Sequence, residues 1–322
     1  MNIILAPNRI KEQEMRNVYC NTLIEIAKEN KEVVVLDADL MSSMGMRKFA
    51  EEFPERTFDV GIQEANMIGV AAGLSATGKI PFAHSFGPFA TRRCFDQLFL
   101  SIGYSGHNVR VIGSDPGVTA AFNGGTHMPF EDMGIVRNIP NVTILEPVDG
   151  VMLADLVKQT AKLKGFFYIR LLRKNAIKIY EEGSTFEIGK GITLRDGKDV
   201  TIIATGIMVN DALEAAEVLN NEGISAKVVN IFTLKPIDKD LIIKCAKETG
   251  ALVTVENHNI INGLGSAVSE VISENIPVPL ERVGIRDRFG QVGSVDYLKK
   301  TYGLTVEDIV KSCKKAIKRV RA

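Results

Sequence analysis

The chain has no tryptophan, only four cysteines and no long uninterrupted apolar stretch. Cys20, Cys94, Cys245 and Cys313 are widely spaced, so neither a disulfide framework nor a thiolate metal site is expected, and a reducing compartment is indicated. No stretch is long enough to span a bilayer, and residues 1–10 lack the apolar core of a signal peptide. We therefore expect a cytoplasmic protein.

An excess of charge of one sign is also lacking, because 39 Lys and Arg residues balance 39 Asp and Glu residues. This balance gives no reason to expect nucleic acid or a membrane surface as a partner. The chain has neither a Gly-x-Gly-x-x-Gly motif after its first strand nor a Walker loop, which argues against nicotinamide and P-loop sites. No cluster of His, Cys and acidic residues has metal-ligand spacing, so no metal ligands are expected in this chain.

Apolar runs of strand length alternate with helical patterns, and 322 residues are more than one core usually holds. We expect strands at 33–36, 82–83, 109–112, 142–145, 167–169, 200–204, 225–230, 251–256 and 280–284, and helices at 14–29, 63–76, 89–102 and 149–163. Such alternation predicts mostly parallel sheets covered on both faces. The polar segment 180–199 is typical of a linker, so we expect two parallel-sheet α/β domains, at residues 1–187 and 188–322.

Glu64 is the most informative single residue. It follows Gly61 by three positions and begins a helical pattern, 63–76, that is apolar nearly all round and therefore expected to be buried. The simplest interpretation is a first-turn acid matched to the helix dipole. The alternative is a buried acid with a chemical task, and the stretches further along the chain favour that alternative.

Several other motifs each have a structural and a functional interpretation. Phe86 and Phe89 are three residues apart, which places both rings on one side of a helical turn, either as core or as a slot for a flat heteroaromatic ring. The glycine loop ending at His127 either carries a solvated histidine or one that donates a hydrogen bond or relays a proton. The helix start at 263–266 either caps normally or binds an anion.

Polar residues also follow the expected strands. Arg170 and Arg173 come after the strand at 167–169, either as a surface pair or as a bidentate grip on phosphate. Because ligands of parallel α/β sheets bind beyond the carboxyl ends of the strands, the residues in such positions are candidates for one rim. These residues are Asp39, Ser85, Phe86, Ser114, Asp115, Arg170 and Arg173.

Taken in order, these stretches resemble the C-terminal half of transketolases, and the resemblance covers essentially the whole chain. Related thiamine-diphosphate enzymes include deoxyxylulose-phosphate synthases and the beta subunits of 2-oxo acid dehydrogenases. The matching pieces are Gly61-Ile62-Gln63-Glu64, Phe86 with Phe89, Gly124-Gly125-Thr126-His127, Arg137-x-x-Pro140-Asn141, Glu146-Pro147-x-Asp149, Ala204-Thr205-Gly206, Val255-Glu256-Asn257-His258 and Gly263-Leu264-Gly265-Ser266. The resemblance implies a pyrimidine-binding domain followed by a transketolase C-terminal-like domain.

The resemblance also implies roles at a cofactor site. Glu64 would hydrogen-bond a ring nitrogen of the aminopyrimidine, Phe86 and Phe89 would pack on that ring, and Asp39 would lie near the cofactor. Arg92 falls where transketolases place a third aromatic residue, so that part of the site is altered. A carboxyl that shares a proton with the ring must be hidden from water, because burial favours the protonated form, although the helix N-terminus opposes it.

At the substrate end the resemblance implies seven residues, namely Arg16, Ser43, Ser114, Asp115, Asn123, His127 and Arg173. His127 corresponds to a catalytic loop histidine that faces the hydroxyls of the donor sugar. Asn123 stands where transketolases carry an aspartate that reads donor stereochemistry, and Ser114-Asp115 replaces a second histidine. Arg16, Ser43 and Arg173 correspond to residues at the phosphate end.

No Gly-Asp-Gly motif occurs, although transketolases use one to hold Mg²⁺ and the diphosphate. The resemblance therefore implies a subunit of a split enzyme that uses thiamine diphosphate and Mg²⁺. A separate diphosphate-binding chain would join a homodimer of this chain in a two-plus-two heterotetramer. We expect transfer of a two-carbon ketol unit between sugar phosphates. Alternatives are a carboligase like deoxyxylulose-phosphate synthase, a non-catalytic partner subunit, or a flavodoxin-like binding protein.

Overall fold

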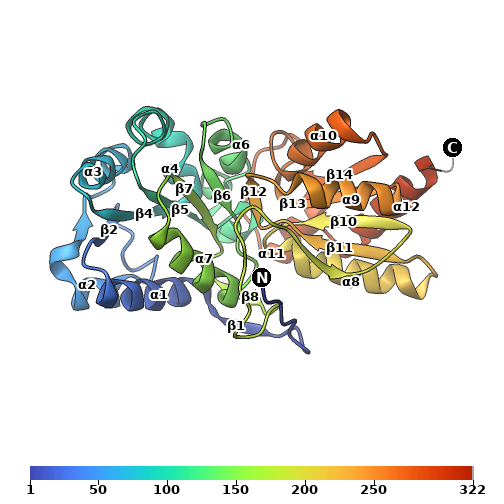
Figure 1. The fold of residues 1–322 in the computed structure, drawn as a ribbon, viewed down its shortest axis with the longest axis horizontal. Coiled ribbons are helices and arrows are strands. Elements are labelled where there is room, and N and C mark those ends of the chain that lie inside the picture. Colours follow the sequence, from blue (N-terminus) through green and yellow to red (C-terminus); the bar gives the residue numbers. More distant parts are fainter. Residues whose placement is uncertain (321–322) are drawn as a thin grey trace.

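The computed structural model describes residues 1–320, which form two α/β sheets side by side and a short pair of strands (Figure 1). The first sheet has seven strands in the order β12-β6-β7-β5-β4-β2-β3. Their bounds are β2 Val33–Asp37, β3 Thr57–Asp59, β4 Ile80–Phe86, β5 Arg110–Ser114, β6 Thr143–Leu145, β7 Phe167–Leu171 and β12 Thr233–Lys235. All neighbours are parallel except β12, which runs antiparallel to β6.

The second sheet has five strands in the order β14-β13-β10-β11-β9. Their bounds are β9 Ile192–Arg195, β10 Val200–Ala204, β11 Ala226–Asn230, β13 Leu252–Asn259 and β14 Leu280–Ile285. Only β9 is antiparallel to its neighbour. A separate pair, β1 Lys11–Glu14 and β8 Asn175–Ile177, is also antiparallel. The prediction of two α/β units with mostly parallel sheets is confirmed.

Helices cover both faces of each sheet, because the strands are apolar on both sides. Around the first sheet lie α1 Met15–Glu29, α2 Arg47–Glu52, α3 Glu64–Ala76, α4 Gly87–Ala90, α5 Phe95–Gln97, α6 Asp132–Val136 and α7 Gly150–Lys162. Around the second lie α8 Met208–Asn221, α9 Lys239–Thr249, α10 Leu264–Asn275, α11 Val295–Tyr302 and α12 Val306–Val320. None of the helices within residues 1–320 combines the length and apolar composition that a membrane crossing requires.

Strand β2 contributes side chains to two separate apolar clusters. Val33 and Val35 join the apolar cluster that contains α1 and α7, whereas Val34 and Leu36 join the cluster that contains α3. Because successive side chains of a strand point to opposite faces, a continuous apolar run is buried on both faces of the sheet.

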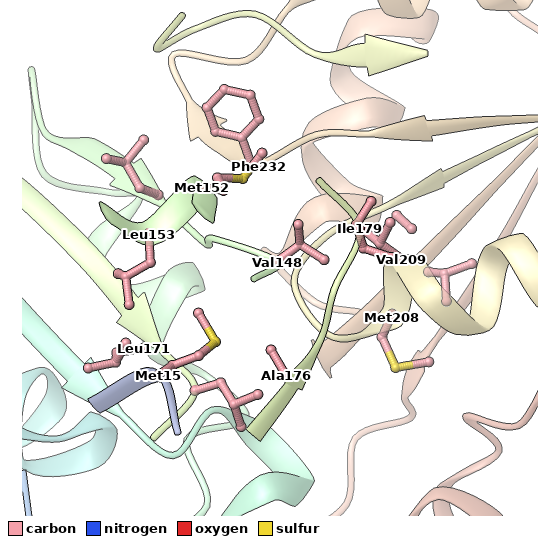
Figure 2. Close-up of a cluster of buried hydrophobic side chains, with 14 of the residues drawn as sticks. Met15, Val148, Met152, Leu153, Leu171, Ala176, Ile179, Met208, Val209 and Phe232 are labelled. Carbon is pink, nitrogen blue, oxygen red and sulfur yellow. The ribbon is translucent and has the colours of Figure 1, made fainter. Parts of the chain in front are cut away.

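The two units share an apolar core. Figure 2 shows side chains from both halves of the chain, among them Met152 of α7, Met208 of α8 and Phe232, all fully buried. The strand β12, which follows Phe232, crosses over and pairs with β6 of the first sheet. The two halves therefore pack as one body around this shared core.

Two local predictions were wrong. The expected helix at 89–102 is broken into α4, a 3-10 turn at Arg92–Cys94, the one-turn α5 and a π-helix at Leu98–Tyr104, because Thr91 leaves helical geometry at φ −124° and ψ −83°. The expected linker at 180–199 begins with the buried Tyr180 and contains strand β9. Because the segment is polar overall, neither the burial of Tyr180 nor strand β9 could be predicted from its composition.

Candidate active site

Glu64 begins α3 directly after the turn that ends β3. Gly61 takes φ +72° in that turn, a left-handed conformation that glycine adopts without strain, and its N–H donates to Asp59. The side chain of Glu64 is buried at 2% exposure, and its Oε1 accepts a hydrogen bond of 3.1 Å from the hydroxyl of Ser85 in β4. The predicted burial of this acid is confirmed, although it opens a helix.

Arg93 is the charged partner of Glu64, and it was not among the residues predicted from the sequence. Its Nη1 donates to Glu64 Oε2 at 2.6 Å, and its Cζ lies 3.9 Å from the centre of the Phe89 ring. The guanidinium thus stacks on an aromatic face while it pairs with the buried carboxylate. Two adjacent arginines were visible in the sequence, but only the break in the helix decides which one turns inward.

Two phenylalanines and a histidine meet beside this pair. The ring centres of Phe86 and Phe89 lie 6.2 Å apart, edge to face, although Phe86 ends β4 instead of standing on a helical turn. The His127 ring lies 5.4 Å from Phe86 and 5.0 Å from Phe89. We call Glu64, Phe86, Phe89 and His127 together the aromatic slot. Residues from three separate segments build it, which favours a binding site over local packing alone.

Arg92 points away from the aromatic slot. It pairs with Glu131 and donates to the backbone carbonyl of Thr126, whose hydroxyl contacts Nδ1 of His127 at 2.9 Å. Arg92 therefore holds the glycine loop instead of packing where a third aromatic residue would stand. Asn123, in the same loop, is exposed at the protein surface.

A second group of predicted residues gathers at the carboxyl ends of the strands. The backbone carbonyl of Ser43 accepts from Arg16 at 3.0 Å and from Arg173 at 3.4 Å. Arg173 also pairs with the buried Asp115 at 3.0 Å, and the Ser114 hydroxyl contacts Asp115 at 3.2 Å. Burial raises the pKa of the Asp115 carboxyl, although the Arg173 guanidinium opposes the rise.

This arginine-rich group adjoins the aromatic slot. The Cζ of Arg173 lies 5.2 Å from the centre of the Phe86 ring, and β4 and β5 place Phe86 beside Ser114 in register. The structure therefore brings the residues predicted for the ring and for the phosphate end onto one rim, as expected for a parallel α/β sheet.

Two predicted residues lie elsewhere. Asp39 is exposed, takes φ +61°, and uses its backbone N–H to bind Asp59; among residues 1–320 no hydrogen bond or ion pair joins its side chain to the aromatic slot. Arg170 lies within β7 and is fully buried, so the idea that it lines the rim is wrong. A strand end could not be fixed to the residue from the sequence.

Arg170 is the centre of a buried ionic network between the two sheets. It donates to Asp132 at 2.9 Å and to Glu146 at 2.8 Å, and it also donates to the backbone carbonyl of Asn257 in β13. Burial raises the pKa of the Glu146 carboxyl, although the Arg170 guanidinium opposes the rise. Several of the matching motifs therefore hold the halves together.

The helix start at 263–266 is also used internally. Its Leu264 and Gly265 N–H groups donate to the two carboxylate oxygens of Glu256, at 2.7 and 2.8 Å, so the anion at this helix start is a side chain of the same protein. Burial raises the pKa of Glu256 to about 8, while these donors oppose the rise. A Cβ at Gly263 would lie 2.0 Å from that carboxylate, which explains the glycine.

In the part of the chain that the structure describes, no group of three or more His, Cys, Asp and Glu side chains is arranged to hold a metal ion. The chemistry available here is a buried carboxyl, an aromatic slot with a histidine, and an arginine pair suited to an anion. Together they suit a flat nitrogen heterocycle and a phosphorylated substrate.

Comparison with known proteins defines the class of this site and fold. Residues 11–178 match the transketolase pyrimidine binding domain and residues 189–309 match the transketolase C-terminal domain. The chain belongs to the transketolase family, whose members are thiamine-diphosphate-dependent transferases.

Individual relatives indicate which part of a transketolase it is. The chain is 51% identical, over 97% of each sequence, to 6-deoxy-6-sulfo-D-fructose transketolase subunit SqwH of Clostridium sp. (strain MSTE9). It is 46% identical to a putative transketolase C-terminal section of Methanocaldococcus jannaschii, over 95% of this chain and 96% of that one. A solved split-gene transketolase, described as an inactive beta4 tetramer, shares 43% identity with a TM-score of 0.87, over 97% of this chain and 99% of that one. The chain thus matches separately encoded transketolase sections over nearly its whole length.

Proposed function

We propose that this chain provides the pyrimidine half of a thiamine diphosphate site and that a partner chain provides the diphosphate half. The observation that carries the proposal is the buried Glu64, which hydrogen-bonds a planar guanidinium stacked on Phe89. A slot that holds one flat N–H donor fits another, and an aminopyrimidine is flat and bears an amino group. Glu64, Phe86 and Phe89 would hold the ring, while Arg92 would hold the glycine loop that carries His127.

Bound there, thiamine diphosphate supplies the carbon nucleophile for ketol transfer. Glu64 would share a hydrogen with the ring through its carboxyl, and the Ser85 hydroxyl fixes that carboxyl by donating to Oε1. The burial of Glu64 supports this role, because a buried carboxyl needs hydrogen-bond donors and the ring would supply one. His127, beside both phenylalanines, donates a hydrogen bond to a substrate hydroxyl or relays a proton there.

The transferred group is a two-carbon ketol unit and the substrates are sugar phosphates. Arg16 and Arg173 lie at the phosphate end and converge on the Ser43 carbonyl, and a guanidinium grips phosphate through two parallel hydrogen bonds. Asp115, which accepts from the Ser114 hydroxyl, pairs with Arg173 and fixes its guanidinium. In this proposal Asn123 contacts the donor sugar from the exposed loop.

The open side of the slot is suited to a partner chain. Phe122 and Phe289 are 74% and 100% exposed, and they flank the glycine loop that carries His127. Two exposed phenylalanines beside the site support an interaction surface there. A partner with Gly-Asp-Gly would hold Mg²⁺ and the diphosphate, giving a two-plus-two assembly around a homodimer of this chain, in the cytoplasm.

Reconstitution tests the proposal. The purified chain is mixed with the diphosphate-binding chain from the same source, thiamine diphosphate and Mg²⁺, and ketol transfer between sugar phosphates is measured. We expect turnover only when all four components are present. Turnover by either chain alone would contradict the division of the site between two chains. Turnover by the mixture without thiamine diphosphate would contradict the assignment of the cofactor.

A further inference from the structure

Arg93 makes two distinct contacts inside the aromatic slot. Its guanidinium lies over the Phe89 ring, with Cζ 3.9 Å from the ring centre. Its Nη1 donates to Glu64 Oε2 at 2.6 Å. Contact with the Phe89 ring and a donor on the Glu64 carboxylate are also the two contacts that we propose for an aminopyrimidine.

Both sets of contacts require the same atoms. Glu64 Oε1 is already bound to Ser85, so Oε2 is the oxygen that remains for a ring. The other side of the slot is lined by His127, which packs edge to face against both phenylalanines. A ring that makes these same two contacts with Glu64 and Phe89 therefore has to take the place of the Arg93 guanidinium.

We propose that Arg93 is a displaceable occupant of the aromatic slot, which fills the place of the pyrimidine ring until the cofactor enters; this inference rests on the proposed function. Arg93 is a positioning residue under this proposal. It keeps the buried carboxylate paired and the phenylalanine covered while the chain is without its cofactor.

The surroundings allow such an exchange. The side chain of Arg93 is 42% exposed, so its departure returns the guanidinium to water, whereas Glu64 is only 2% exposed and needs a new partner. Arg93 sits in the 3-10 turn at Arg92–Cys94, outside a regular helix. Its neighbour Arg92 stays tied to Glu131, which anchors the turn when Arg93 leaves.

The exchange has a measurable consequence for affinity. A ligand that must first displace an internal group binds more weakly, in proportion to the fraction of time that the slot is free. The pyrimidine alone should therefore bind poorly to the wild-type chain, and removal of the guanidinium should improve its binding. A partly exposed ion pair with a stacked arginine corresponds to about a five- to tenfold effect.

The test measures binding of hydroxymethylpyrimidine, the neutral ring half of thiamine, to the full chain by calorimetry and ligand-detected NMR. We expect Arg93→Ala to bind it about five- to tenfold more tightly than wild type. Arg93→Lys keeps the charge without the planar group and should also bind more tightly. Arg56→Ala removes an arginine stacked 4.0 Å over Phe53 elsewhere in the chain and should leave the affinity unchanged.

Each other result is decisive. Equal or weaker binding by Arg93→Ala, including none, overturns the inference, because an emptied slot should accept the ring. Binding by Arg93→Ala that survives Glu64→Ala also overturns it, since the ring would then lie elsewhere. The proposed function fails separately, if thiamine diphosphate binds the two-chain assembly equally well with Phe89→Ala.

Discussion

The side chain of Asn257 hydrogen-bonds the residues on either side of Gly117, across the boundary between the two sheets. Its Oδ1 accepts from the N–H of Val118 at 2.9 Å, and its Nδ2 donates to the carbonyl of Pro116 at 2.8 Å. Asn257 belongs to β13 of the second sheet, whereas Gly117 follows β5 of the first. The second half of the chain thus fixes the loop that begins at Asp115 of the substrate end.

Gly117→Ala should destabilise the protein by more than about 2 kcal/mol. Gly117 takes φ +51°, and a Cβ there would lie 2.1 Å from Asn257 Oδ1, so both strain and collision oppose the change. Urea unfolding measures the loss. The matched control is Gly73→Ala on the exposed face of α3, where nothing lies within 4 Å of an added Cβ, and it should stabilise by about 0.5–1 kcal/mol. Similar values for the two variants would contradict this reasoning.

Arg170→Met should lower the free energy of unfolding by about 3–5 kcal/mol, because it leaves the buried carboxylates of Asp132 and Glu146 without their cation. Chemical denaturation followed by circular dichroism measures the change. Arg137→Met removes a more exposed arginine that pairs with Glu270, and should cost no more than about 1 kcal/mol. A loss below 1 kcal/mol for Arg170→Met would show that the network contributes little.

His258 should stay neutral in the native protein down to about pH 5. Burial lowers its pKa from 6.5 to about 4, and its ring is used as a neutral one, because Nε2 accepts from the Gly134 N–H while Nδ1 donates to the carbonyl of Asn259. NMR titration of the ring resonances measures this. A ring that titrates near pH 6.5 in the folded chain would contradict the hydrogen-bond assignment.

The same shift predicts a pH dependence of stability. Since the folded-state pKa of His258 is depressed, its contribution is fully present above pH 6.5 and is lost as the pH falls through about 4. It is worth up to about 3 kcal/mol at 1.4 kcal/mol per pH unit. Unfolding free energies measured at several pH values should therefore decline on the acid side.

The four thiols should be inert in the folded chain. Cys20, Cys94, Cys245 and Cys313 are all buried, and burial raises the pKa of Cys94 and of Cys313 to about 12. Because the thiolate is the reactive form, iodoacetamide at neutral pH should label none of them quickly and all four after denaturation. Rapid labelling of Cys94 without unfolding would show that the slot region opens readily.

The sequence was sufficient for the parts of the fold that depend on apolar pattern. The runs ending at Leu36, Ile112 and Ile169 predicted strands because a parallel strand is apolar on both faces. The crossover of β12 was not predictable, since Thr233–Lys235 is too short to carry a pattern and gains its partner only when the halves meet. Edge strands such as β9 are hidden for the same reason.

The charged residues of the site show where the sequence was insufficient. The burial of Glu64 followed from the apolar helix after it, but its pairing with Arg93 depends on the backbone break at Thr91. Likewise Arg170 and Arg173 are three residues apart in the sequence, yet one faces the interior and the other the rim. Such choices depend on strand ends and turns that only three-dimensional structure fixes.

The most direct test of the account is Glu64→Gln in the two-chain assembly. Ketol transfer should fall by about 10²–10⁴-fold, because glutamine cannot hold a transferable hydrogen opposite the ring nitrogen. The assembly and its unfolding midpoint should be little changed, and Glu29→Gln on the exposed surface should keep full activity. Near-normal turnover by Glu64→Gln would contradict the assigned role of the buried acid.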